Sequence, residues 1–261
     1  MEDRLRKIFA AILILVIVGI VASAPLIPYS PKSPNFGDEF QRPSWRHWLG
    51  TDQFGRDVLS RLVWGSQISL ISAALSTVIA VSLGVIIGAA SAGVGGYLDW
   101  LLMRGIDILL AVPGILLAML LVATFGRGYL EISLGVGISL SPAFSRLVRA
   151  TLRSIRHAPY IQASEALGAT TTRVIFFHLI PNAVPQIASF SAILFSWAIL
   201  DIAGLEFLGL AGSPDNVSWG RLLNEGRTYM LDAPWIALSA GAAITLTILS
   251  LLTVGRTFRE V

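Results

Sequence analysis

Few side chains of this 261-residue chain have the types and spacings that do chemistry. Histidine occurs only at His47, His157 and His178, and cysteine is absent. The sequence lacks the GxxxxGKS/T pattern that cradles nucleotide phosphates, the HExxH pattern of zinc proteases and the GxSxG turn of hydrolases. We therefore predict no catalytic residue, no metal site and no cofactor bound by this chain, and we do not expect it to be an enzyme.

Two carboxylates, Asp107 and Asp201, interrupt long apolar stretches. An acid inside a membrane helix usually faces the bundle interior or a water-filled path. We therefore name both residues as candidates for a translocation path or gate, and Asp201 as a candidate contact for a cationic group of a solute. Two alternatives stay open. Asp107 can reach the membrane surface from its place near a helix end, and Asp201 can belong to a structural ion pair.

The elements that position these acids belong in a bilayer. The chain is 54% hydrophobic and 13% charged, with a mean hydropathy of +0.73, whereas soluble domains carry roughly 25% charged residues. About 20 apolar residues cross the hydrocarbon layer as a helix. The apolar runs are continuous rather than alternating, so we predict an all-α, polytopic membrane protein with six transmembrane helices. The predicted spans are Leu5–Ala24, Ile68–Ala92, Leu101–Phe125, Tyr129–Val148, Ala183–Ala203 and Trp235–Val254.

The distribution of Lys and Arg predicts the orientation, because these residues are retained on the cytoplasmic side. With the N-terminus inside, the inner segments hold more Lys and Arg than the outer ones and are net positive. Both termini are therefore predicted to be cytoplasmic. The first stretch resembles a signal peptide, but its length of about 17 residues exceeds that of a usual signal core, so we interpret it as an uncleaved span. No basic run with interleaved aromatic residues suggests nucleic-acid binding.

Glycine and proline predict three further features. The four prolines between residues 25 and 34 predict an extended start to the outer segment that ends near Gly65. Pro113-Gly114 predicts a kink or a close helix contact in the middle of a span. Gly84 and Gly88, four residues apart, predict a closely packed helix face.

A short helix is predicted from Tyr160 to Leu167, in the long inner loop at about residues 149–181. Pro159 suits the first position of a helix, where its missing N–H is not needed. Gly168 suits the left-handed residue that ends a helix. Three alanines, Ala163, Ala166 and Ala169, would let a partner approach the backbone closely.

The segment that follows predicts a second helix. Thr170 or Thr171 can cap its start. Pro181 and Pro185 are expected to break it near the membrane surface.

This loop resembles the cytoplasmic coupling loop of the membrane subunits of bacterial ABC importers. That pattern has EAA, three residues, Gly, nine residues and then IxLP. Gly168 and Pro181 fit the spacing, and Ala163 matches within EAA. Glu165 lies about one turn after the expected glutamate, and whether it takes that role stays open. The resemblance implies contact with an ATPase subunit through Tyr160, Gln162, Ala163, Ser164, Glu165, Ala166, Gly168, Ala169 and Pro181.

Three other segments resemble the C-type membrane subunits of dipeptide, oligopeptide and nickel importers. They are His47–Leu70, Arg104–Ala118 and Glu206–Trp235. With the inner loop they follow the family's order over most of the chain. The resemblance implies the type I ABC importer permease fold, with an N-terminal span and outer segment at residues 1–65 and a five-span core at residues 66–261.

The resemblance also implies an assembly in a bacterial or archaeal plasma membrane. Its other members would be a B-type permease, two ATPase subunits that bind ATP and Mg, and an extracytoplasmic substrate-binding protein. Di- or oligopeptides are the first expectation for the solute, with nickel or another small solute as the alternative. A self-sufficient secondary transporter, with Asp107 and Asp201 as a relay, is the rival class.

The outer segments supply candidates for docking of the binding protein. Residues 50–57 suit a tight turn, and a short amphipathic helix is expected after it, with Val58, Leu62 and Gly65 on one side. A solvated cap over the span ends is the alternative reading of these residues. The docking candidates are Asp52, Arg56, Asp57, Arg61, Trp219 and Glu225.

Overall fold

The computed structural model describes residue 19, residues 29–212 and residues 216–257. The predicted first span lies outside these residues apart from Gly19, and so do both ends of the chain. All regular elements in the described part are helical, and its one isolated β-bridge joins Thr51 and Asp57. The helices are α2 (Val58–Val94), α3 (Gly96–Leu110), α4 (Gly114–Phe125), α5 (Tyr129–Arg156), α6 (Pro159–Ala166), α7 (Thr171–Val174), the π-helical turn η2 (Ile175–Leu179), α8 (Ile180–Phe207), α9 (Trp219–Thr228) and α10 (Pro234–Thr257).

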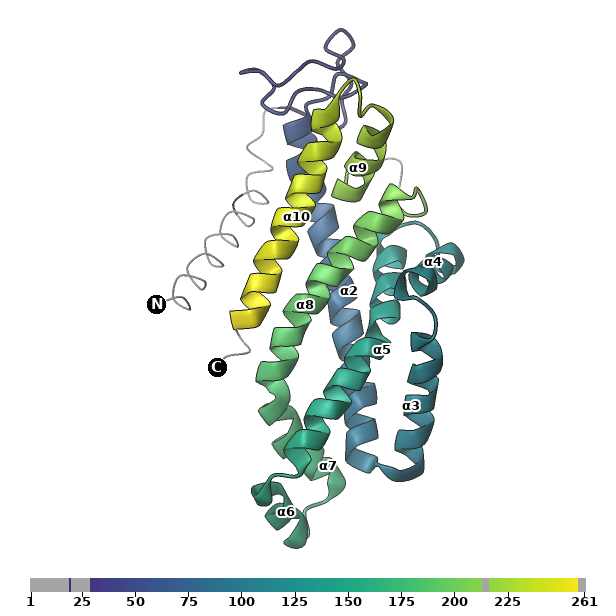
Figure 1. Ribbon diagram of the computed structural model, residues 1–261, viewed down its shortest axis with the longest axis vertical. Coiled ribbons are helices and arrows are strands. Elements are labelled where there is room, and N and C mark those ends of the chain that lie inside the picture. Colours follow the sequence, from purple (N-terminus) through teal and green to yellow (C-terminus); the bar gives the residue numbers. More distant parts are fainter. Residues whose placement is uncertain (1–18, 20–28, 213–215, 258–261) are drawn as a thin grey trace.

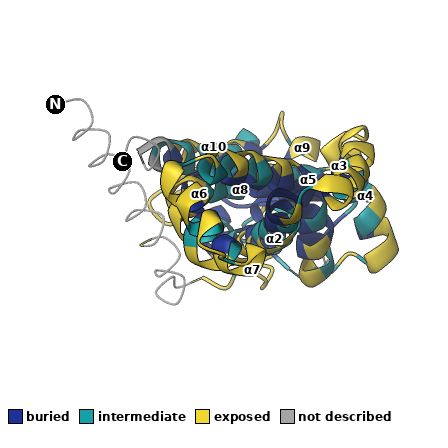
Figure 2. Ribbon diagram, turned by 90° about the horizontal axis from the view of Figure 1, so that it is seen from below, coloured by how far each residue is buried: buried dark blue, intermediate teal, exposed yellow. Residues whose placement is uncertain are grey.

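The helices form an elongated bundle with two distinct ends (Figure 1). Helices α2, α5 and α8 enclose most of the core, which includes Ala80, Val136 and Ile202. Seen along the bundle, buried residues gather between these three helices, whereas α3, α4 and α6 are largely exposed (Figure 2). The irregular segment before α2 lies with α9 at one end, and α6 and α7 lie at the other.

Three helices in the described part are long and apolar enough to cross a membrane: Val58–Val94, Thr171–Phe207 and Pro234–Thr253. The pair α3 and α4 counts as a fourth span if its bend lies within the membrane. The predicted span Tyr129–Val148 falls in α5, which is less apolar because serines line its buried face. Ser139 and Ser145 donate hydrogen bonds to carbonyls of α5 itself. The described residues thus contain three candidate spans, or four with the bent pair, and the number six stays a prediction.

The predicted span Leu101–Phe125 is not one straight helix. The axes of α3 and α4 differ by 89°. Helix α3 ends at Leu110, and α4 begins after Pro113. Because Pro113 has no N–H and restricts the residue before it, the chain turns there. The kink predicted from Pro113-Gly114 is confirmed.

The short outer helix expected after residue 57 is instead the first part of α2. The Asp57 carboxylate caps the helix by accepting a hydrogen bond from the Ser60 N–H at 2.8 Å. No proline interrupts the helix, which continues from Val58 to Val94. It therefore crosses the predicted boundary between the N-terminal part, residues 1–65, and the five-span core, residues 66–261. The expectation of a separate surface helix was wrong, because the cap fixes where a helix starts and not where it ends.

The helix expected to break at Pro181 and Pro185 continues through both. A π-helical turn, Ile175–Leu179, ends two residues before Pro181. This wider turn relieves the clash between a proline ring and the preceding helical turn. Pro181 then falls in the first turn of α8, and Pro185 lies inside that helix. The prediction of a break was wrong because it treated the preceding turn as α-helical.

Helices α2 and α5 pack closely at glycines, as the sequence predicts. A Cβ atom on Gly84 would lie 2.6 Å from the Phe144 ring. A Cβ atom on Gly88 would lie 2.8 Å from the carbonyl oxygen of Ser145 and from the Val148 side chain. Carbon atoms cannot approach this closely, so α5 would have to move.

We expect Gly88→Ala to lower the free energy of unfolding by about 1–3 kcal/mol, because overpacking forces the two helices apart. Thermal unfolding of the purified protein in mild detergent measures this effect. Gly105→Ala is the matched control, since no heavy atom lies within 4 Å of its Cβ position in α3. The control is expected to be neutral or stabilising, because alanine favours a helix over glycine. Equal effects of the two substitutions would refute the close contact.

Candidate functional site

Helix α6 projects from one end of the bundle, between α5 and α7 (Figure 1). Pro159 occupies its first turn, and Gly168 after it has a φ of +89°, which favours glycine. The Thr170 side chain caps α7 by accepting a hydrogen bond from the Arg173 N–H. The short helix and its two boundaries are therefore confirmed. Their role in coupling stays a prediction.

One side chain anchors α6 to the bundle. Ile161 is fully buried in the main core. The other side of the helix faces outward, with Tyr160 51% exposed and Leu167 89% exposed. The remaining residues predicted to contact an ATPase divide in the same way. Gln162, Ala163, Ala166, Gly168 and Pro181 are exposed, and Ser164, Glu165 and Ala169 are half-buried.

The exposed surface of α6 continues onto the π-helical turn. Phe176 is 62% and Phe177 is 75% exposed. They line an open groove of about 910 Å³ together with Thr170, Thr172, Arg173 and His178. The groove combines aromatic faces with one cationic side chain, so the apolar surface at this end of the bundle extends beyond α6.

Glu165 contacts its own chain. Its carboxylate accepts a hydrogen bond from Arg156 Nη2 at 2.9 Å. Arg156 Nη1 donates to the carbonyl oxygens of Ala92 and Gly93, at 3.0 and 2.8 Å. A single guanidinium therefore joins α6 to the C-terminal end of α2. We call this arrangement the Arg156 brace.

Other arginines of α5 contact the start of α3. The Asp99 carboxylate accepts hydrogen bonds from Arg149 Nε at 2.5 Å, from Arg149 Nη2 at 2.7 Å and from Arg153 Nη2 at 2.8 Å. Ser91 of α2 donates to the same carboxylate. With Arg146 and Arg156, these arginines are three or four residues apart and share one helix face. Sequence reasoning missed this set, although the spacing was visible.

The two candidate path acids lie apart in the structure and have different surroundings. Asp107 of α3 forms an ion pair with Arg146, and both side chains are about half-exposed. Asp201 of α8 is half-buried. Within the described residues, neither a hydrogen bond nor an ion pair links Asp201 to another side chain, including Asp107. The structure therefore does not bring the two acids together as a relay.

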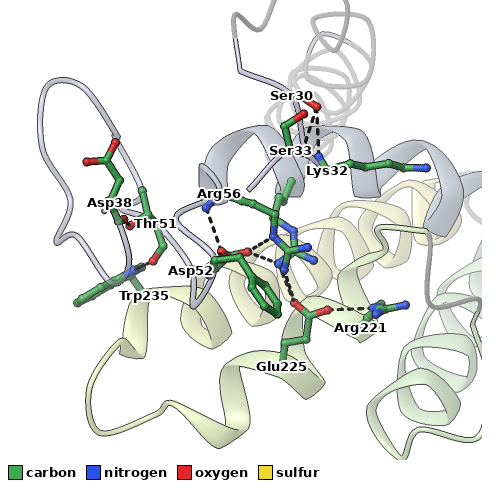
Figure 3. A network of polar contacts seen from close by, with 12 residues as sticks. Ser30, Lys32, Ser33, Asp38, Thr51, Asp52, Arg56, Arg221, Glu225 and Trp235 are labelled. Atoms are coloured by element: carbon green, nitrogen blue, oxygen red, sulfur yellow. Dashed lines mark hydrogen bonds and ion pairs between the residues drawn. The ribbon is translucent and has the colours of Figure 1, made fainter. Parts of the chain in front are cut away.

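A buried network of charges joins two segments that the sequence predicts to be extracytoplasmic, at the end of the bundle away from α6 (Figure 3). Arg61 Nη1 donates to Asp52 Oδ2 at 2.6 Å and to Glu225 Oε2 at 2.7 Å. Arg56 Nε donates to the same Asp52 oxygen at 2.7 Å, and Arg221 Nε donates to Glu225 Oε1 at 2.9 Å. We call these five residues the outer ion network. It fixes the segment before α2 against α9.

The charge balance of this network favours the ionised form of Glu225. Burial alone raises the pKa of the Glu225 carboxyl. The hydrogen bond and the charge of Arg61, with Arg221 and Arg56, outweigh burial and lower this pKa to about 2. Glu225 is therefore a carboxylate throughout the physiological pH range.

Most of the residues proposed to dock a binding protein are buried in the end of the bundle formed by α9 and the segment before α2, which we call the cap. The side chain of Asp52 has no exposed surface, and that of Arg61 is 2% exposed. Asp57 accepts a hydrogen bond from Ser60 and pairs with His47 Nδ1 at 2.9 Å. Trp219 is buried, and its Nε1 donates to the Leu62 carbonyl at 2.9 Å.

Side chains this buried have no surface to offer a partner, so direct docking through them is not supported. Arg56 and Glu225 are also largely covered, because both belong to the outer ion network. Exposed tryptophans at this end include Trp45 and Trp48, which are 97% and 68% exposed. Docking of a binding protein at this end of the bundle stays a prediction.

Comparison with known proteins agrees with this architecture. Residues 80–260 match the family described as the binding-protein-dependent transport system inner membrane component. The chain belongs to this family and is a permease subunit of an ABC importer.

Two relatives match nearly the whole chain. This chain is 35% identical over 253 residues to the glutathione transport system permease protein GsiD of Pectobacterium atrosepticum. The match covers 96% of this chain and 84% of the relative. The chain is also 35% identical over 262 residues to the dipeptide transport system permease protein DppC of Alkalihalophilus pseudofirmus, covering 98% and 86%. A structure of the inward-facing MetNI methionine ABC transporter has the same fold, with a TM-score of 0.64, 18% identity and coverage of 76% of this chain and 95% of that chain.

Proposed function

We propose that this chain forms half of the translocation path of an ATP-driven importer, and that α6 is the surface on which an ATPase subunit acts. The observation that carries the proposal is the way α6 is held. Ile161 and the Arg156 brace fix the helix to α2 and the core, whereas Tyr160 and Leu167 project outward. A partner that moves α6 therefore moves the end of α2 with it.

ATP binding and hydrolysis would take place on other subunits of the importer. The chain supplies no phosphate-binding pattern, and its described residues contain no cluster of three or more metal-ligating side chains. ATP and Mg would bind to two ATPase subunits, and a B-type permease would supply the other half of the path. An extracytoplasmic binding protein would deliver the solute to the end that carries the outer ion network.

We propose a peptide-like solute, with small peptides preferred over nickel. The relatives named above are permeases for glutathione and for dipeptides, which both contain peptide bonds and charged ends. Nickel or another small solute remains the alternative substrate. The secondary-transporter alternative has less support, because Asp107 is paired with Arg146 and no contact links it to Asp201.

Substitution of the most exposed residue of the α6 end tests the proposal. Leu167→Asp places a charge where we expect an apolar contact, and ATP-driven uptake of a labelled dipeptide by the reconstituted importer should fall at least tenfold, which corresponds to about 1.4 kcal/mol. Leu231→Asp is the matched control, since Leu231 is 97% exposed and lies between α9 and α10. Equal uptake by both variants would exclude the α6 end as the contact.

A further inference from the structure

One face of the outer half of α8 is not covered by the described part of the chain. Trp197 is 48% exposed, Leu200 is 57% exposed and Leu208 is 51% exposed. Asp201 and Gly204 lie between them at helical spacing and are half-buried. The adjacent face of the helix is buried in the main core through Leu194, Ala198, Ile202 and Leu205, and half-buried Asp201 lies at the boundary between the two faces. Asp201 is the one charged residue on the uncovered face.

The Asp201 carboxylate has no partner in the described ranges 29–212 and 216–257. The other acid of α8, Glu206, is buried next to Gly220 of α9, on the covered side. An unpaired carboxylate is costly to hold against lipid, so such residues face a wet path or a cation. Asp201 lies six residues, or roughly 9 Å, before the outer end of its helix. A solute entering from outside would reach this level first.

The residues around Asp201 leave room for a ligand on one side. A helical side chain leans toward the N-terminus and covers the preceding turn. Gly204 has no side chain, so the following turn of α8 covers Asp201 only on the side of Leu205, which packs into the main core. Even an added Cβ on Gly204 would approach only Ile115 of α4, at 3.7 Å.

Trp197 lies one turn before Asp201, at the spacing where side chains of a helix meet. Its half-exposed indole presents an aromatic face on the same side of the helix. A carboxylate next to an indole is suited to an ammonium group, which the carboxylate attracts by charge and the ring attracts by its electron-rich face. A carboxylate end of a solute would be repelled from this position.

We propose that Trp197 and Asp201 form a subsite for the cationic amino group of the imported peptide. This inference rests on the proposed function, since the free amino terminus is a cation that every unblocked small peptide supplies. The subsite positions the peptide with its amino end against α8. It also gives the permease a means to distinguish peptides with free and blocked amino termini after their release from the binding protein.

The test uses the complete importer, with both permeases, the ATPases and the binding protein, reconstituted in liposomes. Uptake of alanyl-phenylalanine is compared with uptake of its N-acetylated form. We expect Asp201→Asn to raise the KM for the free peptide about tenfold, the size of one charge-assisted hydrogen bond, and to leave uptake of the acetylated peptide unchanged. Asp201→Glu should retain the preference, and Trp197→Leu should raise the same KM by about threefold.

Asp232→Asn is the matched control, because it removes an exposed carboxylate between α9 and α10. If Asp201→Asn lowers uptake of both peptides equally and weakens assembly with the second permease, the carboxylate pairs with a partner subunit and the subsite is refuted. An unchanged KM in Asp201→Asn also refutes it and leaves the proposed function intact. Import of neither peptide by the unmodified protein would overturn the proposed function together with the subsite.

Discussion

Arg156→Met is expected to reduce ATP-driven uptake at least tenfold while the chain still assembles with its partners. Arg156 makes three hydrogen bonds, one to Glu165 of α6 and two to the carbonyl oxygens that end α2. Methionine keeps the apolar stem and removes all three. Hydrogen bonds to charged groups contribute about 1.5–3 kcal/mol each. Without them, α6 is still held by the packing of Ile161 but is no longer bonded to the end of α2, so we expect its movement to be transmitted poorly to α2.

Two measurements separate loss of transmission from loss of assembly. Co-purification of the ATPase subunits should persist, and their ATP hydrolysis should continue without matching uptake. Arg153→Met is the matched control, since Arg153 is half-exposed and its partner Asp99 retains Arg149. If Arg153→Met impairs uptake as strongly as Arg156→Met, the Arg156 brace has no special role.

Glu165→Gln should have a smaller effect than Arg156→Met, because an amide oxygen can still accept from the guanidinium. A double-mutant cycle of the two substitutions on uptake is expected to give a coupling energy of about 1 kcal/mol or more. Strictly additive effects would show that Glu165 does not act through Arg156.

Arg61→Met is expected to lower the free energy of unfolding by about 3–5 kcal/mol, the usual effect of removing one member of a buried ion pair. Arg61 pairs with both Asp52 and Glu225, and its side chain is 2% exposed, whereas Arg56, which also pairs with both, is 15% exposed. Methionine fills the space and leaves the buried Asp52 with Arg56 alone. Thermal unfolding in detergent measures the loss, and the segment before α2 should become sensitive to protease.

Arg46→Met is the control for this experiment, since Arg46 is 65% exposed and lies 3.8 Å from Asp38. Exposed ion pairs contribute little to stability, so the control should be close to neutral. An Arg61→Met protein as stable as the control would mean that the outer ion network does not hold the cap together.

Acid should weaken the same network in a defined pH window. The pKa of Glu225 is lowered from 4.5 to about 2 in the folded protein. A carboxyl with a lowered folded-state pKa stabilises the fold above its unfolded pKa, and this stabilisation is lost as pH falls toward the folded value. We therefore expect stability to decline between pH 4.5 and about 2. The decline should be smaller in Arg61→Met, and an equal decline would assign it to other carboxyls.

Local sequence chemistry was sufficient for the short inner helix and for the bend between α3 and α4. Pro159 and Gly168 each favour a backbone conformation within their own turn, and Pro113 lacks an N–H and restricts the residue before it. The α2–α5 contact was also visible, since Gly84 and Gly88 lack the side chains that would separate the helices. In each case the signal is contained within a few residues.

The outer ion network and the Arg156 brace depend on contacts between residues that are far apart in the sequence. Arg61 and Glu225 are 164 positions apart, and nothing near either residue identifies its partner. We therefore predicted that both residues belong to a docking surface, whereas in the structure they are buried and form an ion pair with each other. Arg156 was missed for the same reason, because its acceptors in α2 lie 63 and 64 residues away. The π-helical turn before Pro181 has no local sequence signature that we used.

A cross-link from the end of α6 tests most directly whether an ATPase subunit acts on this helix. The chain has no cysteine, so Leu167→Cys introduces a single thiol at a position that is 89% exposed. We expect a short thiol-to-amine cross-linker to join this position to an ATPase subunit in the purified importer, with a yield that changes when ATP is added. A protein that imports peptide normally but forms no such cross-link would contradict the claim that α6 is where the ATPase acts.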